Sequence, residues 1–105
     1  MDEKRKDDIK RIAHHYGLDA QLNVATEELA ELIHAIARFR RYEGEDQKMI
    51  SFLISGMVEE IADVEVMLAQ MEYLLKVEQK VECEIDYKID RQLQRMKKES
   101  EAGDE

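Results

Sequence analysis

Two short acidic strings contain the side chains of this protein that could bind a metal ion. The first, EELAE, spans residues 27–31, and the second, EEIAD, spans residues 59–63. In each string the spacing places several carboxylates on one face of a helix, beside a stripe of apolar residues. If the two helices pack with these faces together, the carboxylates repel one another, and a divalent cation removes that repulsion. Oxygen ligands without cysteine favour Mg²⁺, with Mn²⁺ as the alternative, over zinc.

The composition limits the class of protein that could carry such a site. The chain has 105 residues, with 44% hydrophobic and 39% charged residues, no proline and four glycines, which is typical of an amphipathic all-α protein. We expect one domain over residues 1–98 and a disordered acidic tail over residues 99–105. The formal net charge of -9 disfavours binding to nucleic acid. A single cysteine fits a reducing compartment, and no segment resembles a leader or a membrane span, so we predict a cytoplasmic protein without membrane partners.

The apolar periodicity predicts a bundle of four to five helices that begins with two helices and a loop. The first helix runs over about residues 2–16 and ends at Gly17, a residue suited to a helix end. The second, with Asp19 as its cap, runs to about Tyr42. A polar, glycine-bearing loop over residues 43–46 follows.

The helices of the second half of the chain are less clearly separated. Asp46 can cap the third helix, and Gly56 favours a kink or a fresh start within it. An unbroken helix from there to Met96 would be unusually long, so we expect a turn between residues 76 and 82. The long apolar stripes exceed what one small chain can cover, which predicts a homodimer or homotetramer.

The two acidic strings resemble the hallmark of a known family, the all-α nucleoside triphosphate pyrophosphohydrolases that include the MazG-like proteins and the dimeric dUTPases. That hallmark is Glu-Glu-x-x-Glu followed after a spacer by Glu-x-x-Asp, and the sequences QLN at 21–23 and IADV at 61–64 are also similar. The resemblance covers about residues 18–71. It implies a MazG-like helical bundle and the hydrolysis of an NTP or dNTP to the monophosphate and pyrophosphate.

The resemblance also assigns roles to the acidic residues. Carboxylate-bound metal ions neutralise phosphate charge and position water, and the metal ligands would be Glu28, Glu31, Glu60 and Asp63. Two further acids would support these ligands or orient the attacking water as a base, namely Glu27 and Glu59. Which acid is the base stays open.

Further residues would hold the nucleotide if the resemblance extends to the substrate. Relatives often carry a Lys, an Asn four residues later and an Arg three residues beyond, and this chain keeps that spacing with Gln in place of Asn. Some relatives also have Asn where this chain has Val64, which puts a base or sugar contact there in question. A basic residue near a helix end can equally favour the helix dipole. The expected substrate-binding residues are Gln21, Asn23, Arg38, Lys88, Gln92 and Arg95.

Two alternatives remain at the level of sequence. One is a phosphoribosyl-ATP pyrophosphohydrolase-like enzyme, which has similar size and acidic helices. Another is a non-enzymatic helical oligomerisation module, favoured by the near-heptad apolar spacing of residues 74–96. A di-iron protein is disfavoured, because Glu31 and His34 form only one copy of the Glu-x-x-His motif that such bundles carry twice. We expect His34 to pack or to face solvent.

Overall fold

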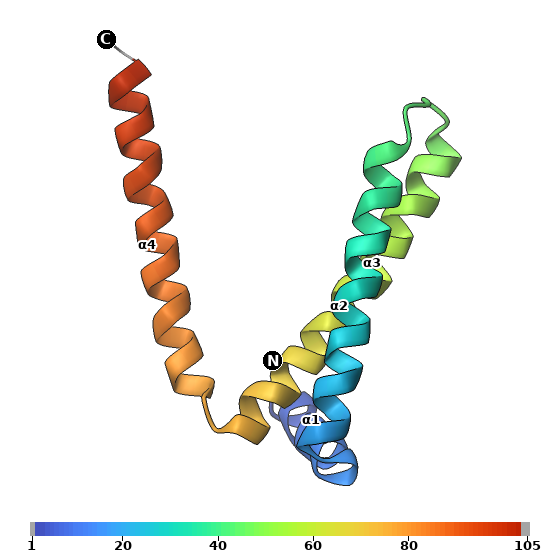
Figure 1. Ribbon diagram of the computed structural model, residues 1–105, viewed down its shortest axis with the longest axis vertical. Helices are drawn as coiled ribbons and strands as arrows, with labels where there is room; N and C mark the ends of the chain where they lie inside the picture. The colour runs from blue at the N-terminus through green and yellow to red at the C-terminus, as the bar shows by residue number, and fades with distance from the viewer. Residues whose placement is uncertain (1, 104–105) are drawn as a thin grey trace. The chain divides into compact units, whose positions relative to one another are not determined.

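The computed structural model of the protein describes residues 2–103, which are almost entirely helical (Figure 1). The all-α class predicted from the sequence is confirmed. The helices are α1 (Glu3–Tyr16), α2 (Leu18–Arg41), α3 (Gln47–Leu75) and α4 (Glu78–Gly103). The chain divides into two compact units, one of them Met1–Leu75 with α1 to α3 and the other Lys76–Glu105 with α4. The single domain predicted over residues 1–98 spans parts of both units.

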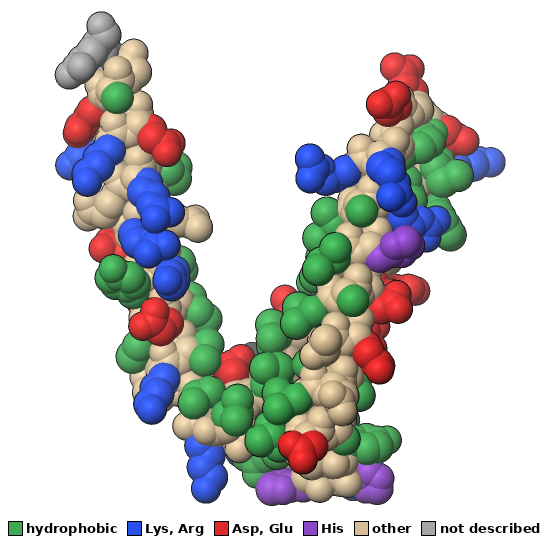
Figure 2. Space-filling model, in the orientation of Figure 1, with side chains coloured by type: hydrophobic (Ala, Val, Ile, Leu, Met, Phe, Trp, Pro, Cys, Tyr) green, Lys and Arg blue, Asp and Glu red, His purple; other side chains and the backbone are tan. Residues whose placement is uncertain are grey.

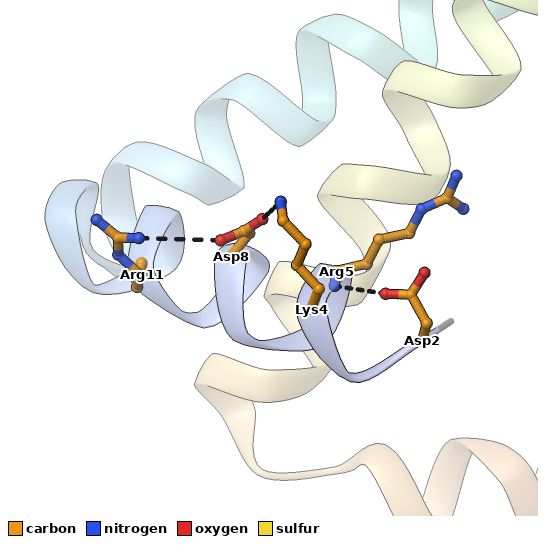
Figure 3. Close-up of polar contacts among 5 residues, drawn as sticks. All are labelled: Asp2, Lys4, Arg5, Asp8 and Arg11. Carbon is orange, nitrogen blue, oxygen red and sulfur yellow. Dashed lines mark hydrogen bonds and ion pairs between the residues drawn. The ribbon is translucent and has the colours of Figure 1, made fainter.

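Polar contacts between neighbouring turns stabilise the start of α1 (Figure 3). Asp2 caps the helix, since its Oδ1 accepts a hydrogen bond from the backbone N of Arg5 at 2.8 Å. Asp8 pairs with Lys4 at 3.0 Å and with Arg11 at 3.9 Å. These ion pairs are exposed, so they add little stability, and the cap is the contact that determines where α1 begins.

Gly17 both ends α1 and begins α2. Its φ of 87° lies in a region that glycine adopts without strain, and its N–H donates to the carbonyl of Ala13 at 2.9 Å. Helix α2 then starts at Leu18 without a side-chain cap. The prediction that Asp19 caps this helix is wrong, because the turn at Gly17 places Asp19 inside the first turn, where its charge instead favours the helix dipole.

Helices α2 and α3 lie side by side and antiparallel, joined by the loop over residues 42–46 (Figure 1). The predicted cap of α3 is confirmed, since Asp46 Oδ1 accepts from the N of Lys48 at 3.0 Å. The fresh start considered at Gly56 is wrong, because α3 is one helix through that position. A glycine inside a helix costs about 1 kcal/mol relative to alanine, a cost that the packing of α3 along α2 outweighs.

The core of this unit lies where α1, α2 and α3 meet. Its buried hydrophobic residues are Ile9, Ala13, Ala25, Leu53, Val64 and Met67. Two polar residues join them: Gln21 is 4% exposed and Gln70 is 1% exposed, and Gln21 Nε2 donates to Gln70 Oε1 at 2.7 Å. Because this hydrogen bond is buried and directional, it disfavours any sliding of α2 along α3.

The second unit is the single helix α4. Lys76, with a φ of 59°, follows the last residue of α3, and α4 begins at Glu78, so the predicted turn between residues 76 and 82 is confirmed. Residues 99–103, predicted to be disordered, continue α4, while residues 104–105 lie outside the described part of the chain. No helix within residues 2–103 combines the length and the hydrophobicity needed to cross a membrane.

Candidate metal centre

The two acidic strings converge where α2 and α3 pack together. Glu28 on α2 and Glu60 and Asp63 on α3 each place one carboxylate oxygen within 4.8 Å of the other two. Glu28 and Glu60 are half-buried, whereas Asp63 is exposed. The i, i+3 spacing of Glu60 and Asp63 lets one helix contribute two of the three groups, and the antiparallel pairing brings the third group from the other helix.

The remaining acids of the strings surround this triad. Glu31 lies one turn after Glu28 and is exposed, and its charge acts on both Glu28 and Glu60. Glu59 acts on Glu60. Glu27 is exposed on α2 and is not among the groups whose charges raise the pKa of Glu28 or Glu60.

One carboxylate oxygen of the triad lacks a hydrogen-bond partner within residues 2–103. Glu60 Oε2 is shielded from solvent and accepts no hydrogen bond from any described residue. Buried polar atoms in folded proteins are almost always paired, and a buried oxygen of an acidic group is especially costly to leave without a partner. A cation between the three carboxylates would provide that partner.

The neighbouring charges oppose ionisation of the two half-buried glutamates. Removal from water is the main cause that raises the pKa of Glu28, followed by the charge and hydrogen bonding of Asp63 and then by the other acids. Removal from water is also the main cause that raises the pKa of Glu60, followed by the charges of Asp63, Glu31 and Glu59. The fold thus holds close together carboxylates that repel one another when ionised. A divalent cation stabilises such an arrangement because its charge offsets the repulsion.

The donor set fits Mg²⁺ or Mn²⁺. All three converging groups are carboxylates from described residues, and hard divalent cations prefer oxygen ligands while retaining several waters. The exposure of Asp63 leaves one side open to water or to a ligand. Exposed acidic groups also occur without a metal, so the unpaired oxygen of Glu60 is the observation that distinguishes this cluster.

A groove of about 270 Å³ shares residues with the acidic centre. Glu31, Glu59 and Glu60 line it, and from them it continues toward the loop between the helices, where basic, aromatic and small residues take over. The additional lining residues include His34, Arg38, Phe52, Ser55 and Gly56. The acidic side chains of this groove could bind a metal ion, and the guanidinium of Arg38 could bind an anionic group. The ring of Phe52 could bind a flat apolar group.

The structure places the expected substrate-binding residues in four different settings. Arg38 lines the groove beside the acidic centre. Gln21 is buried and hydrogen-bonded to Gln70, so its amide is closed to solvent, whereas Asn23 is exposed on α2. The others lie in the second unit on α4, all of them exposed: Lys88, Gln92 and Arg95.

Several groove residues were not predicted as site residues from the sequence. Phe52 is 62% exposed, and an added Cβ at Gly56 would meet no heavy atom within 4 Å, so the groove is open beside it. The available signal was that Phe52, Gly56 and Glu59 recur at steps of three and four on α3 and therefore share a face.

The fold and the centre together define an all-α protein with a carboxylate cluster suited to a divalent cation. No family model, no curated protein and no solved structure matches the chain. The interpretation of its function therefore depends on the acidic strings, the geometry of the triad and the groove.

Proposed function

We propose that this protein is a cytoplasmic, Mg²⁺-dependent nucleoside triphosphate pyrophosphohydrolase that converts an NTP or dNTP to the monophosphate and pyrophosphate. The observation that carries the proposal is the convergence of Glu28, Glu60 and Asp63 around an unpaired Glu60 oxygen. The resemblance of the acidic strings to the pyrophosphohydrolase hallmark supplies the reaction. Mn²⁺ is the expected substitute for Mg²⁺.

The triad would hold the cation, with Glu31 as a further ligand from the exposed side. When bound, the metal ion neutralises phosphate charge during the displacement. In the reaction, a water oxygen attacks the α-phosphorus, the bond from that phosphorus to the bridging oxygen breaks, and pyrophosphate leaves. Glu59, which lines the groove beside Glu60, is favoured over Glu27 to accept the proton of the attacking water.

The groove residues support a nucleotide as the ligand. Arg38 lies seven residues after Glu31, which is two turns along the same helix face, and its guanidinium can pair with phosphate oxygens. Phe52 presents an exposed ring from α3, and flat bases stack on such rings. We therefore assign the acidic end of the groove to the phosphates and the Phe52 end to the nucleoside.

The proposal is tested by measuring pyrophosphate release from a panel of ribo- and deoxyribonucleoside triphosphates, with and without Mg²⁺. Wild type should release pyrophosphate only with the metal, and Glu60→Gln or Asp63→Asn should abolish release while circular dichroism shows an intact helical fold. Glu65→Gln, which makes the same charge change at an exposed position of α3, is the matched control and should remain active. Full activity of Glu60→Gln would refute the proposal. Phosphoribosyl-ATP in the same panel tests the related enzyme class.

One observation favours a second candidate, the non-enzymatic helical oligomerisation module. Helix α4 has no buried residue and exposes an apolar stripe that includes Ile85, Ile89 and Leu93. This candidate predicts association that depends on the α4 stripe, no Mg²⁺ dependence and no loss of that association in Glu60→Gln. The two candidates are separated by the pyrophosphate measurement.

A further inference from the structure

The groove beside the acidic centre has an ordered lining along the α2 and α3 pair. Glu28 converges with Glu60 and Asp63, and the two helices run antiparallel, so each step forward on α2 is level with a step backward on α3. Successive levels that face the groove are about 5 Å apart. From the acidic centre to the loop, the level pairs among the lining residues are Glu31 with Glu59, His34 with Gly56, and Arg38 with Phe52.

These three levels of the groove differ in their chemistry. The first level is acidic, the second combines an imidazole with a glycine, and the third combines a guanidinium with an aromatic ring. The space-filling view shows the same order along this pair of helices, where acidic side chains are followed by a histidine and then by basic side chains toward the loop (Figure 2). The middle level therefore separates the acidic end of the groove from its basic and aromatic end.

The middle level leaves room for a compact polar group. Gly56 has no side chain, and a Cβ added there would meet no heavy atom of residues 2–103 within 4 Å apart from its own helix backbone. The neighbouring lining residues, Ala35 and Ser55, are also small. His34 lines this level from α2 and is exposed, and an imidazole nitrogen can donate or accept a hydrogen bond. The middle level thus presents one polar side chain beside an open space.

The order of the levels matches the covalent order of a nucleotide. This step rests on the proposed function, in which the acidic end binds the phosphates and Phe52 stacks on the base. Arg38 is compatible with that assignment, because side chains on a helix lean toward its N-terminus and Arg38 then reaches back toward the phosphates. Since the sugar joins the α-phosphate to the base, it lies at the level between the acids and Phe52, about 5 Å from each.

The character of the middle level favours ribose over deoxyribose. The two sugars differ in the 2′-hydroxyl, which can both donate and accept a hydrogen bond. A site that selects deoxyribose excludes this hydroxyl with a bulky or apolar side chain, whereas the middle level has a glycine and a histidine. A site that hydrogen-bonds a hydroxyl binds the analogue without it less tightly, because its own polar group is left unpaired.

We propose that the substrate is a ribonucleoside triphosphate whose 2′-hydroxyl lies between His34 and Gly56. The imidazole of His34 forms a hydrogen bond with this hydroxyl, and the absence of a side chain at Gly56 provides the space for it. These two residues determine the sugar specificity of the groove, while the carboxylates of the acidic centre act on the phosphates.

The test is the ratio of kcat/KM for a ribonucleoside triphosphate to kcat/KM for its 2′-deoxy counterpart, measured by pyrophosphate release with Mg²⁺ for each of the common bases. Wild type should prefer the ribonucleotide by about 2- to 10-fold, as expected for one neutral hydrogen bond. His34→Ala should lower the ratio to about one, because only the ribonucleotide loses a contact. His15→Ala, which removes an exposed histidine of α1, is the matched control and should keep the wild-type ratio.

Substitution of Gly56 tests the open space separately. Gly56→Leu should bring the ratio below one, because its side chain occupies the position of the 2′-hydroxyl, and Gly56→Ala should change the ratio less in the same direction. Circular dichroism should show unchanged helical content in both variants, since leucine and alanine are good helix formers and the added Cβ meets open space. A wild-type ratio of one or less, or a ratio that neither His34→Ala nor Gly56→Leu changes, would overturn the proposal.

Binding measurements distinguish failure of this proposal from failure of the proposed function. Calorimetry with the α,β-methylene analogues of ATP and 2′-deoxy-ATP in the presence of Mg²⁺ reports sugar preference without hydrolysis. If wild type releases no pyrophosphate from any nucleotide, the proposed function fails. Tighter binding of the ribose analogue that His34→Ala abolishes would still support the sugar site. Equal binding of the two analogues, or binding of neither, would overturn it.

Discussion

The buried hydrogen bond between Gln21 and Gln70 provides a quantitative test of how the acidic centre is positioned. Gln21 lies seven residues before Glu28, and Gln70 lies seven residues after Asp63, so the pair packs about two turns from the triad along the same two helices. In Gln70→Leu the donor at Gln21 Nε2 loses its acceptor, and at 4% exposure water cannot replace it. An unpaired buried amide costs about 1–3 kcal/mol of unfolding free energy.

The double variant Gln21→Leu/Gln70→Leu should behave differently from either single variant. Replacing both partners by apolar groups of similar size is nearly neutral, so its free energy of unfolding should lie within about 1 kcal/mol of wild type. The assay is urea unfolding followed by circular dichroism at one fixed protein concentration, because association affects apparent stability. If the double variant is destabilised by the sum of the two single effects, the two side chains are not coupled and the reasoning fails.

The same double variant separates the two roles considered for Gln21. If its amide serves packing, as its burial indicates, the folded double variant should retain the Mg²⁺ response and pyrophosphate release of wild type. If Gln21 contacts substrate, as the resemblance to the pyrophosphohydrolases implies, the double variant should fold but lose activity. The second result would contradict the structural role given to Gln21.

Three further predictions concern the acidic centre and the groove. First, the pKa values of Glu28 and Glu60 are raised, so the protonated forms of these two groups stabilise the metal-free fold. Their contribution to the free energy of unfolding is complete below the ordinary pKa of 4.5. It is lost as the pH rises through the raised pKa values. Urea unfolding should therefore show wild type losing stability relative to Glu28→Gln/Glu60→Gln between pH 4.5 and 7, and a pH-independent difference would count against the shifts. Second, Mg²⁺ at pH 7 should raise the melting temperature of wild type but not that of Glu60→Gln, and equal increases would place metal binding elsewhere. Third, Arg38→Ala should lower kcat/KM for a triphosphate by about 10- to 100-fold, as expected for a lost charge-assisted contact. The melting temperature should not change, because Arg38 is exposed. Unchanged kinetics would show that Arg38 is not part of the site.

The sequence predicted the helices and the acidic face well because both depend on local periodicity. Apolar steps of three and four residues located α1 to α3, and Gly17 and the loop before Asp46 marked their ends. The same periodicity predicted that Glu28, Glu60 and Asp63 lie beside apolar stripes. Their convergence depended only on the antiparallel pairing of two adjacent helices, which a short loop favours.

Other features depend on tertiary packing that periodicity does not specify. The sequence pattern around Gln21 is the same whether its side chain binds a ligand or pairs with Gln70, so periodicity does not distinguish the two roles. The helix through Gly56 persists because packing along α2 offsets the local preference. Phe52 is apolar, so its pattern predicts burial, but it faces the groove rather than the core. In each case the deciding contact comes from a residue distant in the sequence.

The central claim is that Glu28, Glu60 and Asp63 hold a divalent cation. Anomalous X-ray diffraction from crystals of the full chain grown with Mn²⁺ tests it most directly, because the signal locates the metal independently of activity. The structure predicts a manganese peak bonded to carboxylate oxygens of all three residues, with Glu60 Oε2 among the ligands. A peak elsewhere, or no peak at the triad under saturating Mn²⁺, would contradict the claim.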